Sequence, residues 1–258
     1  MNAAAAGTRR LDRSVAVTLL LLIGWEASGG DIAVVRGFAG PAGFALRDAW
    51  LTSTLLHDGG RWLAGAVMLL WALVLARPGA SRPSRAEHVY WGGVTIACLL
   101  LVPGLKRLSE SSCPWEIAGF GGQFAYVPHW LPGVTDGGPG HCFPSGHAVA
   151  AFAFFGLYFL WRPYRPALAR WMLAGVVVAG AAFGWAQIAR GAHFPSHVLW
   201  SGWLCWAAAV AAQGLRPSAG RRAVQARVGP RRSSAHSSTA PNVAVPIPPS
   251  LKPPSSSV

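Results

Sequence analysis

The sequence contains few charged residues: Asp, Glu, Lys and Arg make up 12% of 258 residues, and only nine of these are acidic. A soluble domain carries roughly 25% charged residues, so the composition excludes an ordinary soluble protein. Walker-type phosphate loops, dinucleotide-binding fingerprints, EF-hand loops and internal repeats are also missing. Their absence excludes the nucleotide and calcium sites that those motifs build.

What the sequence has instead is apolar residues, 52% of the chain, and thirteen tryptophans, which collect where lipid headgroups meet hydrocarbon. The apolar segments predict an all-α integral membrane protein with six transmembrane helices, at 14–35, 60–76, 88–105, 147–161, 171–189 and 195–213. Arg9, Arg10 and Arg13 precede the first segment, so it resembles a signal peptide. An uncleaved anchor is favoured, because cleavage would leave five spans.

Lys and Arg are distributed unevenly along the chain. They concentrate at both termini and in alternate loops, so the positive-inside rule predicts cytoplasmic termini, residues 1–13 and 215–258, around a membrane domain at 14–214. The outward loop 106–146 then faces the periplasm from a bacterial inner membrane. Residues 215–258, rich in Pro, Ser and Arg, are expected to form a disordered basic tail. Because the basic residues form no aromatic-interleaved face, we expect no nucleic-acid partner.

Two segments carry the chemistry, Cys-Phe-Pro-Ser-Gly-His at 142–147 and Arg-Gly-Ala-His-Phe-Pro-Ser-His at 190–197. Each contains a Pro-Ser pair and opens an apolar run. A helix that begins at such a pair leaves backbone N–H groups unpaired, and these groups attract an anion. Two histidine-bearing helix starts together predict a phosphate site with proton-transfer groups built in.

With Lys106, these segments resemble the three-part signature of the type 2 phosphatidic acid phosphatase (PAP2) family. The resemblance implies a six-helix, PAP2-type bundle that uses a histidine nucleophile and no metal or other cofactor. The site residues that it implies are the nucleophile and the acid, His193 and His147, and the phosphate ligands Lys106, Ser145 and Gly146.

Three positions depart from the family pattern. The first motif has Cys113 where the family has Arg, and the third has Gln187 in place of Arg and His197 in place of Asp. Arg190 lies on the same helix face as Gln187, so we expect it to be the surviving guanidinium that binds phosphate. Arg107 is an auxiliary candidate, although a basic residue at a membrane boundary is more often an anchor.

His197 is expected to be a third catalytic residue, which can accept a hydrogen bond from the nucleophilic histidine as the family's Asp does. It cannot supply the negative charge with which that Asp stabilises the cationic nucleophile. A carboxylate must then come from elsewhere on the outward side. Glu116 ranks first because it is close to Lys106 in sequence, ahead of Asp58 and Asp136.

Cysteine and histidine together allow one alternative, a zinc site with His193 and His197 as ligands and either His147 or Cys113 added. It is not favoured, because Pro195 should leave His193 outside the helix and no His-Glu-x-x-His motif is present. We expect instead that Cys113 and Cys142 form a disulfide, since they share the outward loop in an oxidising compartment. Two unpaired thiols are the other possibility.

The resemblance implies a phosphatase that hydrolyses a lipid phosphate or a polyprenyl diphosphate through a phosphohistidine. Short loops and no added soluble domain favour a lipid that enters from the outer leaflet. Candidates are a polyprenyl diphosphate, phosphatidylglycerol phosphate, phosphatidic acid and a phosphorylated lipid A. Two alternatives stay open: a binding or transport protein that has lost catalysis, and a phosphotransferase.

Overall fold

The structure is a computed structural model. It describes three ranges of the chain, residues 3–76, 83–131 and 133–216, with side chains from residue 11 onward. The chain divides into a helical unit, 1–228, and a C-terminal unit, 229–258. The predicted disordered tail lies, from residue 217 on, outside the described residues.

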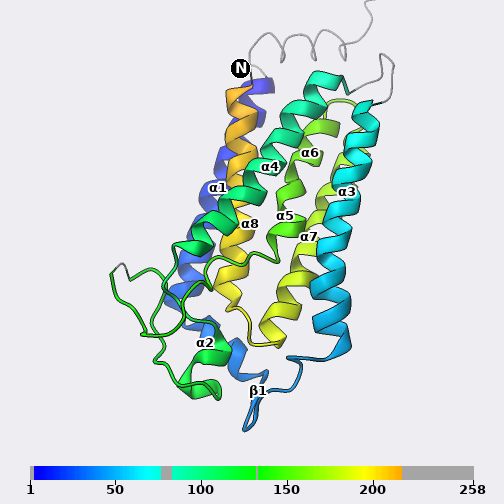
Figure 1. The fold of residues 1–258 in the computed structure, drawn as a ribbon. Coiled ribbons are helices and arrows are strands. Elements are labelled where there is room, and N and C mark those ends of the chain that lie inside the picture. Colours follow the sequence, from blue (N-terminus) through cyan, green and yellow to red (C-terminus); the bar gives the residue numbers. More distant parts are fainter. Residues whose placement is uncertain (1–2, 77–82, 132, 217–258) are drawn as a thin grey trace, which may run out of the picture. The chain divides into compact units, whose positions relative to one another are not determined.

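The described chain is almost entirely helical (Figure 1). Its long helices are α1 (Ala3–Ala27), α3 (Gly59–Ala76), α4 (Arg85–Arg107), α7 (Pro166–Ala189) and α8 (Pro195–Leu215). Its shorter helices are α2 (Gly30–Arg36), α5 (Val149–Phe152) and α6 (Gly156–Trp161). A π-helical segment, Leu51–Asp58, continues into α3, and 3₁₀ turns occupy Pro114–Glu116, Ala118–Phe120 and Ala153–Phe155. Strands β1 (Ala39–Gly40) and β2 (Gly43–Phe44) pair as a short antiparallel hairpin.

Four helical segments are long and apolar enough to cross a membrane: Leu51–Ala76, α4, α7 and α8. A fifth span is made if Leu11–Ala27 and α2, which meet at a bend of 65°, are counted together. The predicted span at 147–161 is represented by the shorter apolar stretch Val149–Trp161. The all-α integral membrane fold is therefore confirmed, whereas the count of six spans stays a prediction.

Helix α8 packs against α1, α4, α5 and α7, so it is the helix around which this part of the bundle is arranged. Two glycines on α7 allow α5 and α8 to approach this helix closely. A Cβ atom at Gly180 would collide with the ring of Phe152, and one at Gly184 would collide with Val198. The helix interface therefore depends on small residues, as is usual between membrane helices.

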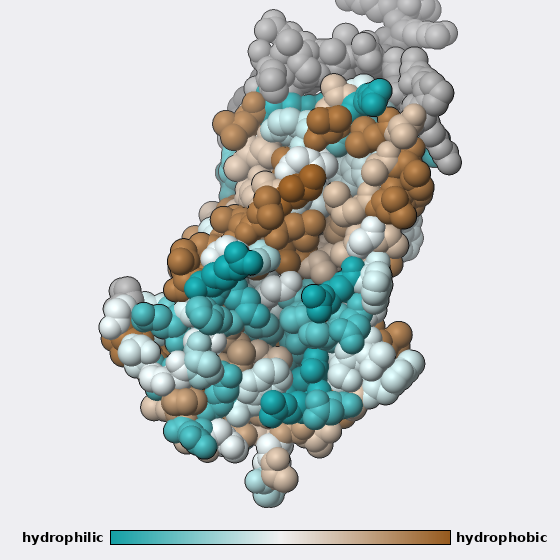
Figure 2. All heavy atoms as spheres, viewed as in Figure 1, coloured by the Kyte–Doolittle hydropathy of each residue, from teal (hydrophilic) through white to brown (hydrophobic). Residues whose placement is uncertain are grey.

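The outer surface of the long helices is apolar. Leu20, Leu69, Leu100 and Trp171 each expose more than 60% of their surface, which in water would be costly. On the face shown in Figure 2, apolar side chains lie over the long helices and polar ones gather toward the end that carries α2 and β1. This is the pattern of a protein whose helices face lipid.

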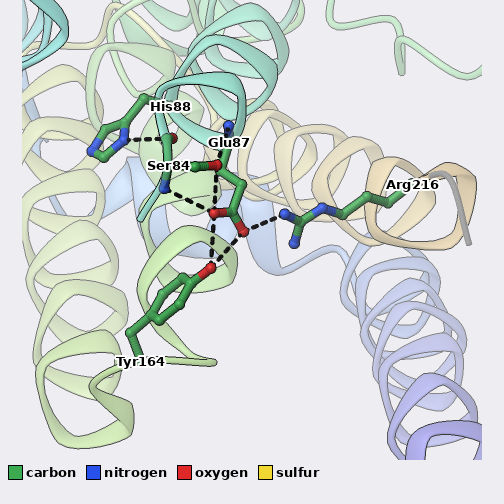
Figure 3. Close-up of polar contacts among 5 residues, drawn as sticks. All are labelled: Ser84, Glu87, His88, Tyr164 and Arg216. Carbon is green, nitrogen blue, oxygen red and sulfur yellow. Dashed lines mark hydrogen bonds and ion pairs between the residues drawn. The ribbon is translucent and has the colours of Figure 1, made fainter. Parts of the chain in front are cut away.

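A buried polar cluster joins three helical segments at the other end of the bundle (Figure 3). The Glu87 carboxylate accepts hydrogen bonds from the Ser84 backbone N–H, at 2.9 Å, and from the Tyr164 hydroxyl, at 2.8 Å. It also forms an ion pair with Arg216, at the end of α8, and both side chains are 9% exposed. Ser84 and Glu87 form a capping box that starts α4, so one carboxylate caps this helix and holds α8 and the α6–α7 connection.

Replacing Arg216 with Met should lower stability, because Glu87 would keep a buried charge without its cation. Breaking a buried ion pair costs about 3–5 kcal/mol, and the low end is expected because Ser84 and Tyr164 still donate to the carboxylate. Thermal unfolding in detergent measures the effect, with Arg170→Met, at an exposed arginine of α7, as the matched control. The double variant Glu87→Gln/Arg216→Met should regain part of the loss. Equal melting temperatures for the Arg216 and Arg170 variants would contradict this role.

Candidate active site

The two sequence segments that carry histidine meet at the end of the bundle that holds β1. The Ser145 N–H donates to the His197 carbonyl at 3.0 Å, and the Ser201 hydroxyl lies 2.9 Å from the carbonyls of both Ser145 and His197. The His197 Nδ1 lies 3.0 Å from the Cys142 carbonyl oxygen, to which it donates when protonated at that nitrogen. These backbone contacts bring residues distant in the chain into one site.

His147 and His193 face the same small region, with ring centroids 6.3 Å apart. A separation of this size leaves room for one phosphoryl group between two imidazoles. His193 is 2% exposed and lies just before α8, which begins at Pro195. His57 from the π-helical segment packs against His147, with ring centroids 4.1 Å apart and ring planes tilted by 33°. Sequence reasoning had not placed His57 in the site.

Several buried polar atoms here have no hydrogen-bond partner within the described residues. They include Ser145 Oγ, His147 Nδ1 and Gln187 Nε2. The carbonyl of Gln187 accepts from the backbone N–H of His193 at 3.2 Å, so Gln187 lies at the base of the His193 loop. Buried polar groups are normally paired, so unpartnered ones around two histidines indicate a place for a polar ligand.

Cationic residues surround this region. A Cβ atom on Gly146 would lie 3.7 Å from Cδ of Lys106, which places the lysine stem beside the Pro-Ser-Gly-His segment. Arg190 is half-buried, and its Nε donates to the Arg47 carbonyl at 2.7 Å. Arg107 is exposed at the end of α4. The described part of the site therefore has the charge that suits an anion.

Burial and neighbouring charge keep the histidines neutral. Burial, followed by the charges of His57, Lys106, Arg61 and Arg190, lowers the pKa of His147 to about 3. Burial, followed by the charge of Lys106, also holds the pKa of His193 well below its ordinary value. A neutral imidazole has a free lone pair, so His193 has the protonation state that a nucleophile needs.

The second helix start does not form an open anion site, which corrects the expectation from the sequence. The Asp31 carboxylate accepts the Ser196 backbone N–H at 2.8 Å and also pairs with the Ser196 hydroxyl. This carboxylate already occupies the N-terminus of α8. The first helix start also differs, because α5 begins only at Val149 and the Pro-Ser-Gly-His segment forms the turn before it. Any phosphate site is therefore built mainly from side chains and this turn.

Cys113 and Cys142 are joined by a disulfide, with Cα atoms 5.2 Å apart. The Cys142 sulfur lies 3.5 Å from Nδ1 of His193, so the cross-link lies directly against the histidine loop. Cys98 and Cys205 are free and buried in α4 and α8. With Cys113 in a disulfide, the zinc alternative has no thiolate from that residue.

The candidate carboxylates from the sequence have other partners. Glu116 accepts the Cys113 backbone N–H at 2.7 Å and so caps the 3₁₀ turn Pro114–Glu116. Asp136 holds the backbone and hydroxyl of Ser112, and Asp58 pairs with His57 at 2.8 Å. None of these contacts places a carboxylate against His193.

A half-buried carboxylate that the sequence did not single out is Glu26, near the end of α1. Its Oε1 lies 2.9 Å from Nε2 of His129, and the Trp200 indole N–H donates to the same oxygen at 2.7 Å. His129 lies edge-to-face against His197, with ring centroids 5.4 Å apart, and stacks on Phe143 at 3.8 Å. The sequence feature that could have identified Glu26 is its acidic side chain at the end of an apolar segment, because charged residues within such segments are rare and usually functional.

Comparisons with known proteins identify the family and the fold. The sequence model of the PAP2 superfamily matches residues 87–219, more than half of the chain, so the chain belongs to the PAP2 superfamily. It is a multi-pass membrane protein of the phosphatase class that this family defines.

A solved structure similar in fold is described as the first transmembrane PAP2 type phosphatidylglycerolphosphate phosphatase from Bacillus subtilis. It is 18% identical, with a TM-score of 0.50, and the match covers 78% of this chain and 94% of that one. At this identity the likeness concerns the fold. No curated protein sequence gives a significant match.

The histidines should stay neutral in the ligand-free protein throughout the physiological range. Because the folded-state pKa of His147 lies below its ordinary value, the unfolded chain binds its proton first, and this group destabilises the fold as pH falls below about 6.5. NMR of ¹⁵N-histidine-labelled protein, assigned with His→Gln variants, should show His147 and His193 uncharged at pH 5.5. Adding inorganic phosphate should raise both pKa values. Protonation of either ring near pH 6.5 without phosphate would contradict the described electrostatics.

Proposed function

We propose that this chain is a metal-independent phosphatase that hydrolyses the phosphate or diphosphate of a membrane lipid through a phosphohistidine. The observation that carries the proposal is the pair of imidazoles, His147 and His193, with ring centroids 6.3 Å apart, in surroundings whose burial lowers the pKa of both rings. His193 attacks phosphorus in line while His147 delivers a proton to the leaving oxygen. Phosphate binding raises the pKa of His147, so His147 can hold that proton in the complex.

The phosphate ligands are Lys106, Ser145, Gly146 and Arg190. Ser145 contributes its unpartnered hydroxyl, and Lys106 neutralises charge beside Gly146, where the absence of a side chain lets an anion approach. After the leaving group departs, neutral His147 accepts a proton from water as the water attacks the phosphohistidine. This second step returns His193 to its starting state and releases phosphate.

An apolar cavity supports a lipid substrate. It has a volume of about 220 Å³ and lies between α3, α5, α6 and α7, with Ala150, Phe154 and Met172 among its lining residues. Ala150 follows His147 by three residues in the sequence, and we propose that a lipid chain in this cavity extends toward the site. A lipid chain held there would leave its headgroup beside His193. By the distribution of Lys and Arg, the proposal places this headgroup in the outer leaflet.

Removing either histidine should abolish phosphate release, because nucleophile and acid act as a unit. His193→Ala and His147→Ala are compared with His141→Asn, which changes an exposed histidine with φ of 57° to a residue that tolerates this backbone. Purified protein in detergent is assayed with phosphatidylglycerol phosphate, phosphatidic acid, a polyprenyl diphosphate and a soluble aryl phosphate, with and without EDTA.

The lipids should react faster than the aryl phosphate, and EDTA should change nothing. An active His193→Ala protein would end the phosphohistidine mechanism. Phosphate release only with a lipid acceptor would identify a phosphotransferase, and binding without release would identify a lipid-binding protein. Loss of activity in EDTA that zinc restores would favour the metal alternative.

Glu26 is proposed as a positioning residue that supplies the charge the family obtains from Asp at position 197. The developing cation on His193 is flanked by His197, whose ring lies 5.9 Å away, and His197 by the His129–Glu26 pair. The side chains of His129 and Glu26 are 8% and 10% exposed, so little water screens this carboxylate. The negative charge of Glu26 stabilises the cation that develops on His193 during phosphoryl transfer.

Glu26→Gln should therefore lower kcat by at least about tenfold, or about 1.4 kcal/mol, with KM nearly unchanged. Glu26→Asp should recover part of the rate, because it restores the charge. Glu110→Gln, at an exposed carboxylate of the outward loop, is the control and should stay active. A merely structural role predicts equal losses for the Asp and Gln variants and a lowered melting temperature, which would contradict the assignment.

A further inference from the structure

Three side chains with the donor atoms of a soft-metal site converge beside the candidate nucleophile. The sulfur of Cys142 and one ring nitrogen each of His193 and His197 all lie within 4.8 Å of one another. All three residues are buried, with exposures of 0–2%. Two ligands of one tetrahedral zinc ion lie about 3.3–3.8 Å apart, given Zn–N near 2.0–2.1 Å and Zn–S near 2.3 Å. The group is thus close to the size of a zinc site.

The disulfide prevents the Cys142 sulfur from acting as one of these ligands. While Cys142 is bonded to Cys113, its sulfur carries no charge and is a poor ligand for a divalent ion. Reduction would free the sulfur at its present position, 3.5 Å from Nδ1 of His193 and 3.0 Å from the Ala192 carbonyl. Two imidazoles and a thiolate form a ligand set that zinc, cobalt and related ions favour.

We propose that reduction of the Cys113–Cys142 disulfide creates a binding site for a soft divalent ion of the Zn²⁺ class on Cys142, His193 and His197. A thiol or phosphine reductant supplies two electrons and is itself oxidised, and each cysteine sulfur takes up one proton. On metal binding the Cys142 thiol releases its proton to solvent. Water or a phosphate oxygen fills the fourth position.

This site is inhibitory and distinct from a catalytic metal centre. A neutral imidazole bound to a metal through Nδ1 carries its proton on Nε2, so no lone pair is left to attack phosphorus. The oxidised protein is a metal-free phosphatase, whereas the reduced protein in zinc is blocked. Metal binding does not require the proposed function, and only the inhibition rests on it.

The test measures the absorption spectrum of Co²⁺ added to the protein, because a thiolate ligand produces characteristic visible and near-ultraviolet bands. The full chain in detergent first receives Cys98→Ala and Cys205→Ala, so that no other free cysteine competes. Cys113→Ser in this background leaves Cys142 as a free thiol without any reductant, and Cys142→Ser leaves Cys113 instead. The two variants differ only in which sulfur remains.

The expected result is a cobalt–thiolate band in the Cys113→Ser protein and in the phosphine-reduced parent, and none in the oxidised parent or the Cys142→Ser protein. Adding His197→Ala to Cys113→Ser should weaken Co²⁺ binding at least tenfold. The reduced parent carries no substitution at the disulfide, so it decides the result if Cys113→Ser fails to fold. Equal bands in the two serine variants, or no band in the reduced parent, would overturn the proposal.

Activity supplies a second, separate readout. Zn²⁺ should lower phosphate release at least tenfold in the reduced parent and leave the oxidised parent unchanged, and a chelator should restore the rate. A cobalt band in a protein that releases no phosphate under any condition would support the metal site while rejecting the proposed function. Zinc inhibition of equal size in the oxidised and reduced proteins would show that the ion binds elsewhere.

Discussion

The site depends on the hydrogen bonds that tie the Pro-Ser-Gly-His turn to the first turn of α8. Ser145 N–H to the His197 carbonyl, and Ser201 to two backbone carbonyls, leave few ways for these segments to move apart. All of these residues are buried, where each unmade hydrogen bond costs about 1–3 kcal/mol. The positions of His147 and His193 follow from this backbone arrangement, with the disulfide at Cys142 as a covalent addition to it.

The electrostatics of the site follow from the burial of the histidines among cationic side chains. Burial, followed by nearby positive charge, lowers the pKa of both imidazoles, so both rings are neutral in the absence of an anion. A phosphate dianion would reverse this preference, because its charge offsets the cationic residues. In the proposed mechanism, phosphate binding and protonation are therefore coupled, and His147 acts as an acid only when a leaving group is bound.

The sequence predicted the parts of this protein that local patterns encode. Apolar segments located α3, α4, α7 and α8, and the Pro-Ser-Gly-His and His-Phe-Pro-Ser-His segments located the two histidines. The capping of α8 by Asp31 could not be foreseen, because the carboxylate comes from a helix far away in the chain. The same holds for Glu26, whose partner His129 lies in an irregular loop without periodicity. Distance in sequence, more than side-chain chemistry, limits what can be predicted.

Both of these unforeseen contacts, made by Asp31 and Glu26, come from the bend at the end of the first helix. Two of the nine acidic residues, Glu26 and Asp31, flank the bend between α1 and α2, where apolar side chains would be expected. Asp31 holds the start of α8, and Glu26 lies behind His129 and His197. Because a buried carboxylate acts over several ångströms in a medium of low dielectric, it need not stand at position 197 to oppose a cation on His193. In the proposed mechanism, the bent N-terminal helix pair therefore contributes to the site's electrostatics as well as to the membrane-embedded bundle.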